Sequence, residues 1–265
     1  MQVNPGLDRE SWRGTLAGQS RGVPRLRLRA PLRTSDSGTA AFFGVADDDK
    51  LYWVKVPDNP AGVQSVVNEV VVSRLGEMLS APLRPTTLLA VSGAFGDWSI
   101  RAGWPLRECV AYASLHLPNA IEDDDLLHVR RDDNARRHAS IVGLWDLCIG
   151  DDPQWLFDLS DDRATWSFDH GFWFGGGAGW TPVLLDRMRD VPWAWTGSLT
   201  GMDPEEFSRM ADAMDSLTDR DILSAVSGVP VDWRIPDDEL ETLAWFLFYR
   251  KSGAASRLRA LAASI

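Results

Sequence analysis

The chain has 265 residues, of which 45% are hydrophobic and 25% are charged, so its composition is that of an ordinary globular protein. Its formal net charge of −11 argues against a nucleic-acid-binding surface. Its two cysteines, Cys109 and Cys148, are too few for a disulfide scaffold or a thiolate zinc site. Because no apolar run approaches a membrane span and no signal-peptide core is visible, we expect a cytoplasmic protein without membrane contact, built as one large domain or two lobes.

Basic residues are distributed unevenly. The first 33 residues carry seven arginines against Asp8 and Glu10. Such an arm could contact an acidic partner, but a solvated edge strand with a frayed terminus is the favoured interpretation. Lysine is rare, with three residues among the 27 Lys and Arg, and only Lys55 does not stand in polar surroundings.

The first part of the chain is patterned as an antiparallel sheet with one helix. Strands are expected at residues 24–32, 39–45, 50–56, 84–93 and 97–106. Between the third and fourth strands, apolar residues recur at helical spacing over residues 59–80, which predicts an amphipathic helix. We therefore expect residues 1–105 to form a β-rich, nucleotide-binding lobe of α+β class.

From about residue 120 the pattern is mostly helical. Helices are expected at residues 134–150, at 203–216, from about 218, at 237–251 and at 254–264. Two short strands, at residues 155–159 and 165–168, form a hairpin within this part. Residues 106–265 are thus predicted to be a helical catalytic lobe, packed closely against the first lobe around a cleft.

Lys55 stands in "LYWVKVP", a strand rich in aromatic and β-branched residues. A lysine in such a strand either reaches the surface or is held by carboxylates. Glu69 follows 14 residues later, at the edge of the valine stripe of the next helix. A strand lysine and a helix glutamate can pair across a cleft, so that the lysine holds the α and β phosphates of a nucleotide and the glutamate orients it.

The second half of the chain supplies carboxylates in two loops. The segment "GDDPQW" follows a helix, and Asp169 follows the strand "TWSF". One loop could accept a proton from an attacking hydroxyl while the other holds Mg²⁺, for which Asp151, Asp152, Gln154 and Asp169 offer hard oxygen ligands. Taken singly, each aspartate is better explained as a turn residue or helix cap, and their order along the chain is what favours a site.

Four segments resemble the HipA-like branch of the protein-kinase-like fold, which is related to the phosphatidylinositol kinases. They are "YWVKVPDN…VVNEVVVSRLGEMLSAPLRPTTLLAV", "WDLCIGDDPQW", "WSFDHGFWF" and "VPVDWRIPDDELETLAWFLFYRK". They are similar, in that order, to the family's lysine strand with its Asn-Glu helix, its catalytic loop, its Asp-His-Gly metal-binding segment and its C-terminal tail. The resemblance spans residues 24–251. It implies a bilobal kinase-like fold and an ATP- and Mg²⁺-dependent serine/threonine kinase that transfers the γ-phosphate to a hydroxyl acceptor, whose identity is left open and for which a protein is one option.

The resemblance also implies roles for single residues. It places Lys55 on the ATP phosphates, makes Glu69 its partner and makes Asp169 a metal ligand. The connection at residues 102–110 would lie against the adenine.

A second implied element is the turn "TSDSG" at residues 34–38, which would cover the phosphates. In this turn Gly38 would let the backbone approach the nucleotide, and Ser35 and Ser37 would donate hydrogen bonds.

The catalytic loop departs from the family pattern. The family usually carries an Asp-Arg pair with an Asn five residues on, whereas this loop reads "DDPQW" and has no Asn at that distance. Gln154 is therefore the candidate for the amide oxygen on the metal, and either Asp151 or Asp152 could be the base.

This departure motivates an alternative function, a pseudokinase that binds nucleotide or a partner protein without efficient phosphoryl transfer. A third hypothesis, a glycosidase using Asp152 and Asp169, gives the Lys55–Glu69 pair no role. His170 could contact a phosphate, but a structural role, bonding backbone within its loop, is favoured.

Overall fold

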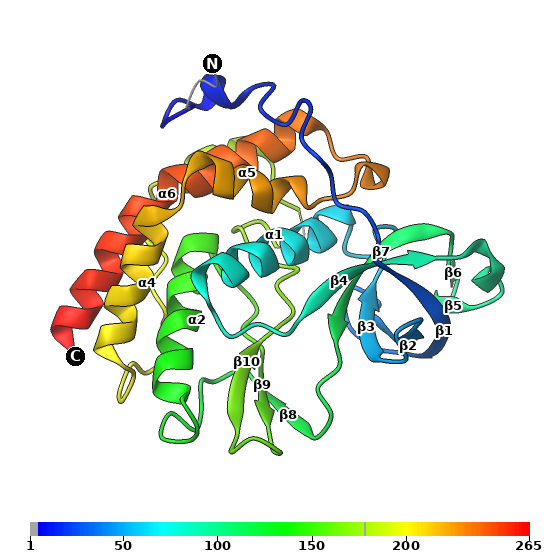
Figure 1. The fold of residues 1–265 in the computed structure, drawn as a ribbon, viewed down its shortest axis with the longest axis horizontal. Coiled ribbons are helices and arrows are strands. Elements are labelled where there is room, and N and C mark those ends of the chain that lie inside the picture. Colours follow the sequence, from blue (N-terminus) through cyan, green and yellow to red (C-terminus); the bar gives the residue numbers. More distant parts are fainter. Residues whose placement is uncertain (1–4, 178) are drawn as a thin grey trace.

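The structure, a computed structural model, describes residues 5–177 and 179–265. It has a mixed α+β architecture, in which a barrel of strands precedes a mostly helical part (Figure 1). One core cluster fills the barrel and a larger one joins the helices to each other and to the barrel. In the described part of the chain, no helix is both long enough and apolar enough to cross a bilayer.

Five strands close into the barrel. In the order in which they pair, they are β1 (Leu26–Thr34), β2 (Phe42–Ala46), β3 (Leu51–Lys55), β7 (Cys109–Leu115) and β4 (Thr86–Val91). The β1–β4 pair is parallel and the other pairs are antiparallel. Alternate side chains such as Phe42, Val54 and Leu89 point inward and are completely buried, as the two-residue period of a strand requires.

The barrel extends beyond residue 105, the predicted boundary between the two lobes. β7 lies beyond it and pairs with both β3 and β4, so the chain leaves the barrel only after Leu115. Residues 97–106, expected to be one strand, form a small hairpin of β5 (Ser99–Arg101) and β6 (Trp104–Pro105), because Gly103 turns the chain with a φ of 78°. The connection 102–110, expected to contact an adenine, thus belongs to the barrel side of the molecule.

Helix α1 (Val63–Leu79) joins β3 to β4 at the predicted place. Val66, Val71 and Leu75 are completely buried in the larger core, and the helix ends at Ser80, which adopts a left-handed conformation with a φ of 57°. Since α1 lies between the barrel and the other helices, polar residues on it are buried too, and these need partners.

The rest of the chain contains a second sheet and the remaining helices. The sheet consists of β8 (Ala120–Asp123), β9 (Trp155–Asp158) and β10 (Ala164–Ser167), and the helices are α2 (Asn134–Cys148), α3 (Pro182–Met188), α4 (Pro204–Ser216), α5 (Asp219–Ser227) and α6 (Asp237–Ser264). α5 begins with a capping box between Thr218 and Asp221. The two terminal helices expected from the sequence are one helix of 28 residues, because Ala254, Ala255 and Leu258 continue its buried face past Gly253.

Arg250 of α6 holds the end of α2 in place. Its buried guanidinium donates to the carbonyl oxygens of Asp146 at 2.7 Å and Leu147 at 3.1 Å. It also donates to the carbonyls of Met188 and Val191, both at 2.8 Å. Because the last carbonyls of a helix have no partner within the helix, this arginine fixes the position where the loop at residues 149–154 begins.

We expect Arg250→Met to lower the free energy of unfolding by about 3–5 kcal/mol, because it leaves several buried carbonyls without a donor. Urea unfolding would measure the change. The matched control is Arg259→Met on the same helix, since Arg259 pairs with Asp212 and Asp215 at the surface and its loss should cost less than about 1 kcal/mol. Equal losses in the two variants would contradict the role of Arg250.

Candidate functional site

Lys55, the last residue of β3, binds two carboxylates from distant parts of the chain. Its Nζ atom lies 2.5 Å from Oε1 of Glu69 and 2.6 Å from Oδ1 of Asp169. Lys55 is 5% exposed and Glu69 is 1% exposed, so the pair is almost completely shielded from water. The structure therefore brings together the three residues that the sequence nominated from β3, α1 and the segment after β10.

The charges of this group stabilise one another. Burial alone lowers the pKa of the Lys55 ammonium, but the charges of Asp169 and Glu69 outweigh it and hold the pKa above its ordinary value. Burial likewise raises the pKa of the Glu69 carboxyl, but Lys55 and His170 overcome this and keep the pKa well below its ordinary value. Both side chains are therefore charged at neutral pH.

Asn68 positions the segment that carries Asp169. The amide nitrogen of Asn68 donates to the carbonyls of Gly171 at 2.8 Å and Trp173 at 3.0 Å, and its amide oxygen accepts a hydrogen bond from Trp180 Nε1 at 2.8 Å. Asp169 itself is in the left-handed region, with a φ of 54°. Two adjacent residues of α1 thus hold the same loop: Asn68 through hydrogen bonds to its backbone, and Glu69 through the lysine that it shares with Asp169.

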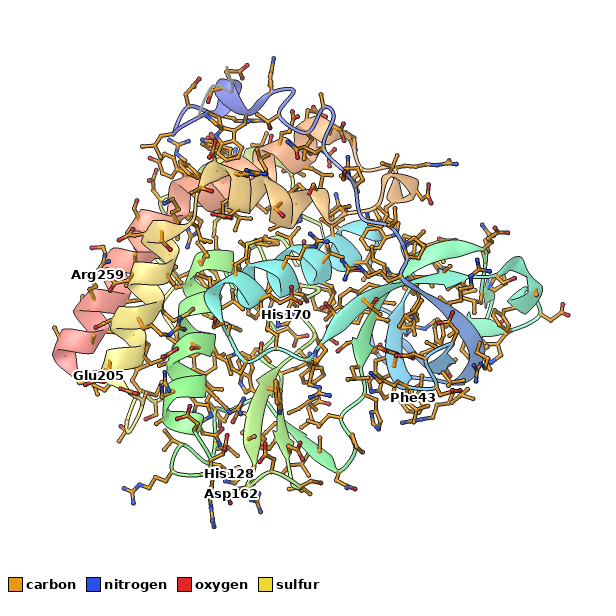
Figure 2. All side chains as sticks on the ribbon, in the orientation of Figure 1. Phe43, His128, Asp162, His170, Glu205 and Arg259 are labelled. Atoms are coloured by element: carbon orange, nitrogen blue, oxygen red, sulfur yellow. The ribbon has the colours of Figure 1, made fainter. Side chains whose placement is uncertain are left out.

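His170 lies next to Glu69, in the middle of the molecule beside α1 (Figure 2). Its Nε2 atom lies 2.8 Å from Ser167 Oγ, and its Nδ1 atom lies 3.5 Å from Glu69 Oε2. The ring also packs edge-on against Trp173. These contacts fit the favoured structural role, with the difference that His170 contacts side chains rather than backbone.

The loop at residues 150–154 places its two aspartates differently. Burial raises the pKa of the Asp152 carboxyl, and the negative charge of Asp169 raises it further. Gln154 Nε2 donates to Asp152 Oδ2 at 2.8 Å, which leaves the amide oxygen of Gln154 free of that contact. Asp151, which is exposed as Asp152 is, accepts a hydrogen bond from the Asp152 amide, as a turn residue does.

Glu122 of β8 is a further acidic residue of the site, which the sequence did not reveal. Burial raises the pKa of its carboxyl, and the charges of Asp169 and Asp152 raise it further. Glu122 lies opposite Leu156 of β9, so the pairing of the two strands brings it to the loop before β9. Its sequence context, a polar "IEDDD", is typical of any solvated turn.

The turn at residues 34–38 lies next to the segment that follows Asp169. A side chain at Gly38 would meet the ring of Phe172 at 3.6 Å. The hydroxyl of Ser35 donates to the carbonyl of Ala41 at 2.8 Å, and the hydroxyl of Ser37 accepts from the amide of Ala41 at 3.1 Å, so both shape the turn. Within the described residues, the backbone N–H groups of Asp36 and Gly38 form no hydrogen bond, and such groups can bind an anion.

The donors found here are of the kind that a divalent cation takes. The charge of Asp169 raises the pKa of both the Asp152 and the Glu122 carboxyl, and a cation would relieve this repulsion. Their oxygens and the amide oxygen of Gln154 are the hard ligands that Mg²⁺ takes. Among the described residues, the carboxylates that lie close enough together to hold one ion are those of Asp123–Asp125, a mostly exposed cluster at the end of β8. Asp169, Asp152 and Glu122 are not in that cluster.

The sequence matches no known protein family and no curated protein. Solved structures are similar in fold. CtkA, a proinflammatory kinase of Helicobacter pylori, aligns with a TM-score of 0.62 and 12% identity, over 93% of this chain and 99% of its own. The Golgi casein kinase aligns with a TM-score of 0.50 and 11% identity, over 96% of this chain and 75% of its own. The same kinase with Mn/ADP bound reaches a TM-score of 0.48, which is too low to support an argument. The chain therefore has a kinase-like fold, and the resemblance to the HipA-like family stays a prediction.

We expect Glu69→Gln to lower the free energy of unfolding at pH 7 by about 2–4 kcal/mol, because Lys55 then keeps only one carboxylate. A carboxyl whose pKa is lowered on folding stabilises the protein above its ordinary pKa of 4.5 and loses this effect as the pH falls toward the folded value. The difference between wild type and variant should thus be constant from pH 7 to about 5 and shrink below it.

Urea unfolding across this pH range would measure that difference. The control is Glu77→Gln, on the same helix but exposed, for which we expect little change at any pH. A difference for Glu69→Gln that does not shrink in acid would contradict the lowered pKa.

Proposed function

We propose that the protein is an ATP- and Mg²⁺-dependent phosphotransferase, a HipA-like serine/threonine kinase that transfers the γ-phosphate of ATP to a hydroxyl acceptor. The observation that supports it most is that one buried ammonium, that of Lys55, contacts Glu69 and Asp169 together. In kinases a strand lysine oriented by a helix glutamate binds nucleotide phosphates, next to an aspartate that holds metal. The kinase-like fold is consistent with this proposal.

In this proposal the nucleotide lies between two lobes, with the barrel as the nucleotide-binding lobe. The turn at residues 34–38 would cover the phosphates with the free N–H groups of Asp36 and Gly38, rather than with the two serine hydroxyls. The adenine would lie near residues 116–119, where the chain passes from β7 to β8, instead of against residues 102–110.

The carboxylates would divide the chemistry between them. Asp169 and Gln154 would hold Mg²⁺, which neutralises phosphate charge when bound. Asp152 would accept the proton of the acceptor hydroxyl. At the same time the oxygen of that hydroxyl would form a bond to the γ-phosphorus, and the bond between the γ-phosphorus and the departing ADP oxygen would break. Its raised pKa suits a proton acceptor better than an ordinary aspartate.

We expect Asp152→Asn to lower the rate of phosphoryl transfer by about 100-fold or more, the usual contribution of a positioned base. Asp151→Asn, one residue away and exposed, should change the rate only a few-fold, and Asp169→Ala should abolish transfer. ATP turnover with a panel of hydroxyl acceptors measures all three. Equal rates for wild type and Asp169→Ala would reject the proposed roles.

A pseudokinase is the second candidate. It is favoured by the loop at residues 150–154, which lacks the Arg and Asn of the family and turns the amide nitrogen of its Gln154 toward Asp152. Such a protein would bind nucleotide or a partner protein without efficient transfer.

Nucleotide binding and turnover separate the two candidates. Mg-ATP at 100 times its Kd should stabilise the wild type by about 2.7 kcal/mol in thermal unfolding, and Lys55→Met should abolish the effect. Stabilisation accompanied by turnover supports the kinase, and stabilisation without turnover on any acceptor supports the pseudokinase. The absence of any nucleotide effect would contradict the kinase and would leave, of the pseudokinase, only a protein that binds a partner protein.

A further inference from the structure

The basic N-terminal segment lines a large cavity that is separate from the Lys55 site. The cavity has a volume of about 1310 Å³, above the roughly 300–1,000 Å³ of most small-molecule pockets. Its walls come from residues 11–25, from α1, from β4 and from the beginning and end of α5. Figure 1 shows this N-terminal segment passing α5 before it enters β1. Lys55, Glu69 and Asp169 are not among its lining residues.

The lining of the cavity is positively charged, although the whole chain is acidic. Counted over the described residues, five arginines face two acidic residues. The arginines are Arg13, Arg21, Arg25, Arg74 and Arg220, and the acids are Glu77 and Asp219. Arg13 and Arg21 pair with Glu10 and Asp237, which lie outside this lining.

Within this lining, the positive charge of Arg25 acts on that of Arg74. Neither guanidinium has an ion pair in the part of the chain that the structure describes. Burial lowers the pKa of Arg74; the carboxylate of Glu77 acts in the opposite direction, and the positive charge of Arg25 lowers the pKa further. Two arginines that repel each other across a cavity are an arrangement that an anion between them would stabilise.

The backbone keeps the Arg74 side chain in this position. Arg74 Nη1 donates to the carbonyl of Ser224 on α5 at 3.0 Å, and its Nε lies against Gly228, where a side chain would collide with it at 2.2 Å. The guanidinium is therefore anchored on one side, with further N–H donors left for a ligand. Arg25 is exposed and its side chain forms no hydrogen bond within the described residues.

We propose that this cavity binds a small phosphorylated molecule, with its phosphate between Arg25 and Arg74. A planar guanidinium matches two oxygens of a phosphate, so two of them can hold it from both sides. A small ligand inside the cavity is influenced mainly by the local arginines, because charges beyond about 8 Å are largely screened at physiological salt. A long polyanion would instead meet the net charge of −11.

The experiment uses the full chain, with pyrophosphate and inorganic phosphate as probes and sodium chloride at matched ionic strength as the salt control. Isothermal titration calorimetry should show saturable binding to the wild type. Arg25→Gln and Arg74→Gln should each weaken it about tenfold or more, which corresponds to about 1.4 kcal/mol. The matched control is Arg27→Gln, an exposed arginine two residues from Arg25 that does not line the cavity and should bind as the wild type does.

Binding to the nucleotide site is distinguished by Lys55→Met. The proposal requires that Lys55→Met retains phosphate binding and that Arg25→Gln weakens it about tenfold or more, whether or not the protein is a kinase. Arg25→Gln removes no side-chain hydrogen bond, so it tests the site even if Arg74→Gln weakens the fold. Unchanged binding in Arg25→Gln, loss of binding in Lys55→Met, or no saturable binding to the wild type would each overturn the proposal. Tighter binding of a phosphoserine peptide than of pyrophosphate would overturn the assignment to a small molecule.

Discussion

The arrangement of this molecule depends on one interaction, the pairing of the buried Lys55 ammonium with two carboxylates. Its two partners, Glu69 and Asp169, come from a helix 14 residues away and from a segment 114 residues away. Glu69 is buried and Asp169 is partly buried, so their two carboxylates would repel each other if the cation were removed. The barrel, α1 and the segment after β10 therefore have to meet in one geometry for any of the three charges to be tolerated.

Hydrogen bonds to backbone carbonyls set that geometry, within which the three charges meet. Asn68 fixes the backbone at Gly171 and Trp173, so the loop that carries Asp169 is tied to the helix that carries Glu69. Arg250 does the same for the end of α2 and the following loop. Trp233 Nε1 donates to the carbonyl of Val110 on β7 at 2.7 Å, which ties the helical part to the barrel. Each link is a hydrogen bond to a carbonyl, whose position is insensitive to pH and salt.

The sequence predicted those parts of the fold that follow from local patterns. The helix α1, the strands β1 to β4 and the order in which Lys55, Glu69 and Asp169 occur all have periodic or positional signals. β7 is not among the predicted strands: its run "CVAYASL" follows a hairpin, and only its first two residues lie in the connection expected at residues 102–110. Its identity as a central strand depends on pairing with both β3 and β4, which no local pattern records. The two terminal helices were separated at Gly253 for the same reason, since only the buried face of α6 shows their continuity.

Polar roles were harder to predict than positions. Asn68 precedes Glu69 in a valine-rich helix, where an amide has no obvious local function. Its three contacts lie more than 100 residues away in sequence. Glu122 likewise belongs to the acidic cluster only because β8 pairs with β9. By contrast, the structure gives the two aspartates different partners, the Asp152 amide for the Asp151 carboxylate and Gln154 for the Asp152 carboxylate, a distinction that two adjacent aspartates in a turn cannot show in sequence.

The proposed function has two requirements that involve Asp169: a free N–H donor on Lys55 for the nucleotide, and enough positive charge beside the phosphates. A lysine ammonium has three N–H donors, and Glu69 and Asp169 already engage two of them. A nucleotide would therefore find one free donor on Lys55, while its own negative charge would add to that of Asp152 and Glu122. Two like unit charges 4 Å apart repel by about 4 kcal/mol near a protein surface, so the phosphates need further positive charge. A divalent cation that draws Asp169 away from Lys55 would meet both requirements, since it neutralises the carboxylates and leaves the ammonium to Glu69 and the phosphates.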